Sequence, residues 1–164
     1  ENVFKFANSN RENLYIGSEV YMAGIGQLLG DVISNDLDNV RIVTGDIRML
    51  LDEVTEPIFD HVVIICPDPW PKLKHHKRRI IQPRLIHKIS QLMAKGGCIS
   101  IKSDVEELFN YMDMTISDSK CFNNYISKGS EIINSYNPLN FKTNRENYVI
   151  RKKLKVFEKL YKKI

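Results

Sequence analysis

The chain has 164 residues, of which 43% are hydrophobic and 27% charged, and its formal net charge is +4. This composition is that of a soluble globular protein of one-domain size, and the positive excess weakly favours a polyanionic partner. No apolar run approaches the ~20 residues that a membrane span needs, and the chain does not open with a signal peptide, so we expect no membrane association.

Strands and helices are predicted to alternate through the first half of the chain. The apolar spacing over residues 20–33 is helical, whereas the β-branched run at 62–66 is typical of a buried strand. The predicted elements are the end of a helix within 1–13, a strand at 14–19, a helix at 20–33, a strand at 40–43, a short helix at 47–54 and a strand at 62–66.

The same alternation continues through the second half. Apolar residues recur at helical spacing over 80–94, before Gly96 and Gly97 end the helix. Strands separated by helices imply right-handed crossovers, so we expect a single α/β domain over 1–164, built as a three-layer sandwich around a mainly parallel sheet. The remaining predicted elements are a strand at 98–102, a helix at 105–114, an antiparallel strand at 122–126, a loop-rich stretch at 127–142 and a strand at 154–161.

Four acidic residues stand where predicted parallel strands end, namely Glu19, Asp46, Asp68 and Asp104. Right-handed crossovers bring the carboxyl ends of such strands to one edge of the sheet, where ligands bind in open α/β folds. One acid at such a position is more often a helix cap than a ligand, and an acid after the second strand typically accepts hydrogen bonds from a ribose. Four in succession favour a binding site over four separate caps.

The loop after the 62–66 strand carries the most specific chemistry of the chain. It reads Pro67-Asp68-Pro69-Trp70-Pro71-Lys72-Leu73-Lys74-His75-His76-Lys77-Arg78-Arg79. The prolines push Asp68 and Trp70 toward extended backbone, so neither belongs in a helix. A carboxylate, an indole face and a dense positive cluster are the groups that would hold a base beside a phosphate backbone. A core tryptophan followed by merely solvated charges would have the same composition.

These residues resemble the signature of the tRNA (guanine-N7-)-methyltransferases, which are S-adenosylmethionine-dependent enzymes. The match covers the Pro-Asp-Pro-Trp-Pro-Lys run at 67–72 and the His-His-Lys-Arg-Arg run at 75–79, and the aligned pattern continues through essentially the whole chain. The resemblance implies a Rossmann-like class I methyltransferase fold. It also implies transfer of a methyl group to N7 of a guanine in the tRNA variable loop, which forms 7-methylguanosine.

The resemblance further implies roles for individual residues. Glu19 matches the acid that binds the cofactor ribose, Asp46 matches the position beside the adenine, and Asp68 matches the acid at the methyl-transfer centre, which also borders the cofactor. The positive cluster is expected to hold the tRNA backbone through Lys74, Lys77, Arg78 and Arg79. Positions expected to contact the substrate are Lys72, Asp104 and the Thr-x-x-Glu-like segment Thr143-Asn144-Arg145-Glu146.

The sequence departs from this family pattern at its beginning. The family's first strand and its glycine-rich cofactor loop fall just before Glu1. We therefore expect a methyltransferase domain that lacks both, with a gap between the strands at 14–19 and 62–66. Binding of S-adenosylmethionine by these 164 residues alone is expected to be weak for the same reason.

The remaining expectations concern partners and alternatives. Three cysteines without metal-like pairing indicate reduced thiols and a cytoplasmic protein, and the four histidines lack metal-ligand spacing, so no metal is expected. The expected partner is tRNA, bound by a monomer or homodimer with no evident partner subunit. Two alternatives remain. The first is an amino-methyltransferase of adenine or cytosine, because Asp68-Pro69-Trp70 partly resembles the active-site loop of those enzymes. The second is a non-catalytic RNA-binding module.

Overall fold

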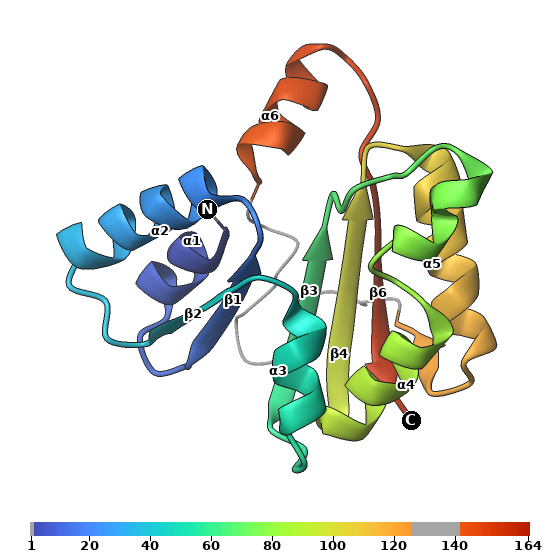
Figure 1. Cartoon of the computed structure of the whole chain (residues 1–164), viewed down its shortest axis with the longest axis horizontal. Helices are drawn as coiled ribbons and strands as arrows, with labels where there is room; N and C mark the ends of the chain where they lie inside the picture. The colour runs from blue at the N-terminus through green and yellow to red at the C-terminus, as the bar shows by residue number, and fades with distance from the viewer. Residues whose placement is uncertain (1, 126–141) are drawn as a thin grey trace. The chain divides into compact units, whose positions relative to one another are not determined.

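The computed structural model describes residues 2–125 and 142–164 (Figure 1). They belong to two compact units. The first unit is Glu1–Val54 with Phe141–Thr143, and the second is Thr55–Asn140 with Asn144–Ile164. The expectation of one domain over 1–164 stays a prediction.

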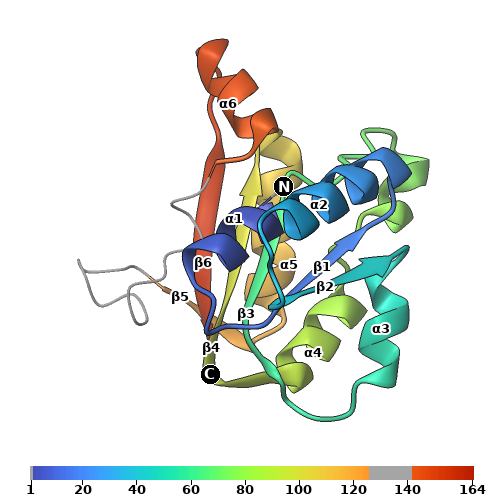
Figure 2. The same ribbon diagram turned by 90° about the vertical axis from the view of Figure 1, so that its left-hand side faces the viewer.

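The first unit is a pair of parallel strands with helices packed against them. Strand β1 (Tyr15–Glu19) pairs with β2 (Val40–Thr44) in register from Tyr15↔Val40 to Glu19↔Thr44. Ala7, Leu37 and Val40 form its buried centre, which Val32 helps to cover. The views of Figures 1 and 2 place α1 and α2 on the same side of the two strands. The helices of this unit are α1 (Asn2–Ser9), α2 (Met22–Ser34) and α3 (Ile47–Glu53).

The second unit is a mixed four-stranded sheet in the order β3-β4-β6-β5. Strands β3 and β4 are parallel, and β6 lies antiparallel to both β4 and β5. Helices α4 and α5 cover one side of this sheet (Figure 1). The elements are β3 (Phe59–Ile65), the 3-10 helix η1 (Leu73–Arg78), α4 (Pro83–Leu92), β4 (Met93–Ser103), α5 (Glu106–Asp118), β5 (Phe122–Asn124), α6 (Asn144–Arg151) and β6 (Phe157–Lys163).

The core of the second unit lies between β4 and α5. Leu108, Met112 and Ile116 are four residues apart, so they share one face of α5, and all three are buried. Ile99 and Ile101 of β4 are fully buried because β4 is an inner strand with neighbours on both sides. Each such side chain contributes roughly 1.5–3 kcal/mol to stability when it is fully buried. This packing fixes the position of the strand ends that carry the site.

Most elements expected from the sequence are present, including the antiparallel strand after residue 121, which is β5. The basic stretch 73–78, expected as a loop, is a short 3-10 helix, and the expected loop-rich stretch 127–142 lies almost wholly outside the described residues. Helix α6 was not predicted, because Glu146 and Val149 are its buried residues and this pattern lacks an apolar stripe. Strand β3 is half-buried rather than buried, because within the described residues it pairs with β4 alone.

Candidate active site

The carboxyl ends of β3 and β4 form the sheet edge on which the second unit's polar residues gather. These strands are parallel neighbours, with Ile65 paired to Lys102. The N–H of Cys66 donates to the carbonyl of Lys102 at 2.9 Å, which extends the pairing one residue past β3. Asp68 and Asp104, which follow these adjacent strands, therefore stand at the same edge, as the sequence predicted.

The loop that leaves β3 has a constrained backbone. Cys66 and Trp70 adopt φ values of 45° and 43°, a left-handed region that residues other than glycine rarely occupy. The guanidinium of Arg78 lies over the Trp70 ring at 5.0 Å, and the ring of His75 meets it edge-on at 5.8 Å. Trp70 is therefore held by its own loop. Such held, unfavourable conformations are concentrated at functional sites.

The carboxylate of Asp68 projects from this loop into solvent. Among the residues that the structure describes, none forms a hydrogen bond or ion pair with it. A carboxylate in this state can accept hydrogen bonds from a guest or lie beside a positive charge on it. The geometry is thus compatible with the role that the sequence suggests for Asp68.

Arg79 supports the loop after β3 from the protein interior. Its side chain is only 1% exposed, its Nε donates to the carbonyl of Pro69 at 3.0 Å, and one terminal nitrogen forms an ion pair with Glu107 at 2.7 Å. The same nitrogen lies 2.9 Å from Nε2 of His76, and the guanidinium stacks over Tyr111 at 4.8 Å. The expected contact of Arg79 with the tRNA backbone stays a prediction, and it would require this buried cation to leave its partners in the protein.

The other cations of the loop do face solvent. Lys72, Lys74, Lys77 and Arg78 are all exposed, on or beside η1. The 3-10 turn explains why two adjacent arginines differ: it turns Arg78 outward over Trp70 while Arg79 points inward to Glu107. The exposed four are available to phosphate groups.

Helix α6 joins the same edge through two ion pairs. Arg145 contacts Asp104 with its Nε at 2.9 Å and a terminal nitrogen at 2.5 Å. Lys102 pairs with Glu146 at 2.8 Å, and both side chains are at most 3% exposed. Contact of Glu146 with a substrate would require this buried pair to open. Lys102 was not among the residues expected at the site. The feature of the sequence that could have indicated it is its place directly after the apolar run 98–101, at the end of a predicted strand.

Cys66 stands between these charged groups. Burial, together with the negative charges of Asp104 and Glu146, raises the pKa of its thiol to about 11. The thiolate is the reactive form, so we expect alkylation of Cys66 by iodoacetamide at pH 8 to be much slower than that of a free thiol. The test uses a protein in which Cys98 and Cys121 are replaced by alanine, with the rate measured from about pH 7 to about pH 12 so that the range includes the raised pKa.

Asp104→Asn should shift the midpoint of this alkylation profile to lower pH, because it removes a negative charge that disfavours the thiolate. Asp118→Asn, on the last turn of α5, serves as the control and should leave the midpoint in place. A midpoint that does not move in Asp104→Asn would contradict the charge assignment, whatever happens to the maximal rate.

In the first unit, Glu19 and Asp46 stand at the carboxyl ends of β1 and β2. The N–H of Gly45 donates to the carbonyl of Glu19 at 2.9 Å, so these two ends are joined. Oε1 of Glu19 accepts from the N–H groups of Val20 and Tyr21, at 2.8 and 2.9 Å. No described residue donates to its second oxygen, which remains able to accept from a hydroxyl group.

Asp46 is the N-cap of α3. Its carboxylate accepts from the N–H of Arg48 at 2.9 Å and is also bound by the Arg48 guanidinium. These hydrogen bonds from Arg48 lower the pKa of Asp46. Both oxygens are already engaged, so a hydrogen bond from a ligand to this carboxylate needs Arg48 to turn away.

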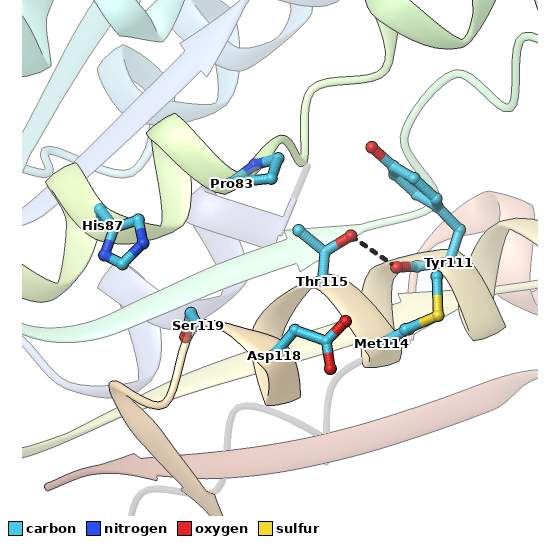
Figure 3. Close-up of a pocket in the computed structure, with 7 residues that line it drawn as sticks. All are labelled: Pro83, His87, Tyr111, Met114, Thr115, Asp118 and Ser119. Carbon is cyan, nitrogen blue, oxygen red and sulfur yellow. Dashed lines mark hydrogen bonds between the residues drawn. The ribbon is translucent and has the colours of Figure 1, made fainter.

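A pocket of about 290 Å³ lies between α4 and α5 (Figure 3). It contains none of the residues predicted for the site, and the hydrogen bond drawn there, from Thr115 Oγ1 to the Tyr111 carbonyl at 2.8 Å, lies within α5. The pocket therefore belongs to the packing of two helices. Its lining residues are Pro83, His87, Tyr111, Met114, Thr115, Asp118 and Ser119.

Within residues 2–125 and 142–164, no three His, Cys, Asp or Glu side chains are grouped so that they could hold a metal ion. Over those same residues, no helix has the length and apolar character needed to cross a bilayer.

Comparison with known proteins places this geometry in context. A family model described as "Putative methyltransferase" matches residues 1–159. A tRNA (guanine-N(7)-)-methyltransferase from Prochlorococcus marinus (strain AS9601) is 38% identical over 168 residues, a match that covers all of this chain and 80% of the relative. A second protein of that name, from Marinobacter nauticus, is 36% identical over 124 residues. That match covers 75% of this chain and 52% of the relative.

Solved structures agree in fold. An antibiotic-related methyltransferase superposes with a TM-score of 0.67 at 18% identity, covering 99% of this chain and 82% of that one. An rRNA methylase from Streptococcus thermophilus gives 0.56 at 16% identity, covering 92% and 74%. At this identity the likeness concerns the fold alone, and it confirms the predicted Rossmann-like α/β class with a mostly parallel core.

Proposed function

The chain belongs to the methyltransferase family whose model matches residues 1–159, and from that premise we propose that it methylates tRNA. The reaction would transfer a methyl group from S-adenosylmethionine to N7 of a guanine in the variable loop, giving 7-methylguanosine. The relatives of that name, similar over the whole chain, support this substrate. The observation that carries the proposal is the exposed carboxylate of Asp68, presented beside an exposed basic 3-10 helix at the end of β3.

Methyl transfer to guanine N7 does not require strong general acid or base catalysis. Guanine N7 is an in-plane lone pair without a proton, so no general base has to remove one. S-adenosylmethionine, when bound, supplies an electrophilic methyl group on a sulfonium. The protein's part is alignment, an effect that can be worth about 7–11 kcal/mol. Asp68 would also stabilise the positive charge that develops on the purine.

The residues proposed for the cofactor are Glu19, Asp46 and Asp68. Glu19 fits a ribose, because its Oε2 can accept from the hydroxyl groups while Oε1 is held by backbone N–H groups. Asp46 fits a place beside the adenine rather than a direct hydrogen bond to it, because Arg48 engages both of its oxygens.

The residues proposed for tRNA are of two kinds. Exposed cations suit the phosphate backbone, with Lys72 nearest to Asp68 along the loop, followed by Lys74, Lys77 and Arg78. Around Asp104, the segment Thr143–Glu146 would contact the guanine or its neighbours through its exposed members. The foremost of these is Arg145, which pairs with the largely buried Asp104.

The two alternative functions are not favoured by the relatives, which are named for guanine N7. Nucleoside analysis separates all three. Unmodified tRNA transcript is incubated with the protein and S-adenosylmethionine, digested to nucleosides and analysed by mass spectrometry. We expect 7-methylguanosine. A methylated adenosine or cytidine would identify an amino-methyltransferase, and tRNA binding without any methylated nucleoside would indicate a binding module; either result would overturn the proposal.

The exposed cations lead to a salt-dependence prediction. Replacing Lys74, Lys77 and Arg78 with alanine should weaken tRNA binding and reduce the slope of log affinity against log salt by up to about 2–3, because each phosphate contact releases counterions. Three exposed lysines away from both η1 and α6, namely Lys95, Lys120 and Lys162, would be replaced together as a control of equal charge. If both triple variants changed the slope equally, the effect would be one of net charge and not of this loop.

A further inference from the structure

Helix α6 has one anchored face and one free face. Glu146 and Val149 are its buried residues, and Glu146 forms the buried ion pair with Lys102. Separating a buried ion pair of this kind costs free energy, so the pair resists displacement. Both views show α6 at the end of the sheet to which β3 and β4 point (Figures 1 and 2). The helix is thus fixed beside Asp104.

The free face of α6 carries an aromatic ring between two cations. Tyr148 is 54% exposed, the guanidinium of Arg145 lies 6.0 Å from its ring centre, and Nζ of Lys152 lies 5.9 Å from it. The N–H of Lys152 donates to the carbonyl of Tyr148 at 3.1 Å, so this lysine is kept on the helical turn above the ring. These residues at i, i+3 and i+7 share one side of the helix.

The charge around this ring favours one class of partner. Residues 144–155 hold five cations, Arg145, Arg151, Lys152, Lys153 and Lys155, against a single acid, Glu146, which is buried and paired. An exposed aromatic ring inside a positive surface is the arrangement that binds single-stranded nucleic acid, through base stacking and phosphate neutralisation. A duplex, whose bases are already stacked, would gain from the charge but not from the ring.

We propose that the exposed face of α6 binds a single-stranded segment of RNA, with one base stacked on Tyr148 and a neighbouring phosphate paired with Lys152. The identity of that RNA as a tRNA loop rests on the proposed function. The fixed position of α6 at the strand ends means that the stacked base would lie next to the one that Asp68 and Asp104 receive. Tyr148 is then a substrate-positioning residue.

The test is equilibrium binding of a 12-nucleotide single-stranded RNA, its duplex and a tRNA transcript. Tyr148→Ala should weaken binding of the single strand and the tRNA by about fivefold to a hundredfold, and Tyr148→Phe should retain it. Lys152→Gln should reduce the salt slope by about 0.7. Tyr125→Ala is the matched control, because the Tyr125 ring also lies near a lysine, with Nζ of Lys162 at 5.5 Å. Lys162 stands opposite Cys98 in the β4–β6 register, toward the end of β4 away from the site.

The outcomes separate this proposal from the proposed function. Unchanged RNA affinity in Tyr148→Ala, with 7-methylguanosine still formed, would overturn the surface and leave the function standing. Loss of single-strand binding in Tyr148→Ala, when the wild type forms no 7-methylguanosine, would support the surface and overturn the function. An equal loss for duplex and single strand would exclude stacking, and preferential binding of phosphatidylserine vesicles over RNA would identify a membrane; either would overturn the proposal.

Discussion

Replacing Asp68 with alanine is expected to lower kcat for tRNA methylation by about 10²–10³-fold, the typical loss when one fixed electrostatic partner of a transition state is removed. The fold should be unaffected, because the carboxylate is exposed on a loop and has no partner among the described residues. Asp68→Asn separates two roles of this side chain. It keeps an acceptor oxygen for positioning the base but cannot neutralise the charge that develops on the purine.

The matched control is Asp60→Ala, an exposed acid at the amino end of the same strand. Its kcat should stay within about twofold of the wild type. A drop of less than tenfold in Asp68→Ala, worth about 1.4 kcal/mol, would remove Asp68 from the reaction centre. If Asp68→Asn matched the wild type while Asp68→Ala did not, Asp68 would act by positioning rather than by charge.

Replacing Arg79 with methionine is expected to have the second largest effect. It removes the donor to the Pro69 carbonyl and the ion pair to Glu107, so the loop that carries Asp68 loses its inner support. A small displacement of reacting groups can reduce the rate about 10²-fold. We therefore expect kcat to fall by that order, with KM for tRNA little changed. The free energy of unfolding should fall by about 1.5–3 kcal/mol, the contribution of a charge-assisted hydrogen bond.

The control for Arg79→Met is Arg78→Met, its exposed neighbour, which should show the opposite pattern. Arg78→Met should raise KM and lower the salt slope of tRNA binding while kcat stays close to the wild type. If Arg79→Met fails to fold, Glu107→Gln replaces it in the test. This variant weakens the Arg79–Glu107 ion pair by a change at an exposed side chain. A salt slope reduced in Arg79→Met as much as in Arg78→Met would mean that Arg79 contacts RNA after all.

The parts of the fold that follow from local patterns could be predicted. The spacing of Leu108 and Met112 gives α5, and the apolar run at 98–101 gives the buried part of β4. The position of Asp68 at a strand end follows from the run before it and the prolines around it.

What could not be predicted depends on contacts between distant residues. Arg78 and Arg79 are adjacent and chemically alike, and contacts with the distant residues Glu107 and Tyr111 distinguish the buried Arg79 from its neighbour. Lys102 and Glu146 are 44 residues apart, so nothing in the sequence near Lys102 reveals its partner. Helix α6 is anchored by the Lys102–Glu146 ion pair rather than by an apolar stripe. Its sequence therefore lacks the periodic apolar pattern from which a helix is predicted.

The most direct measurement of the central claim compares two tRNA transcripts, one ordinary and one made with 7-deazaguanosine, in which a C–H group replaces N7. We expect the protein to transfer radiolabelled methyl groups from S-adenosylmethionine to the ordinary transcript and none to the 7-deaza transcript, while both bind with similar affinity. Equal methylation of the two transcripts would contradict the account, because the methyl group would then be attached to an atom other than guanine N7.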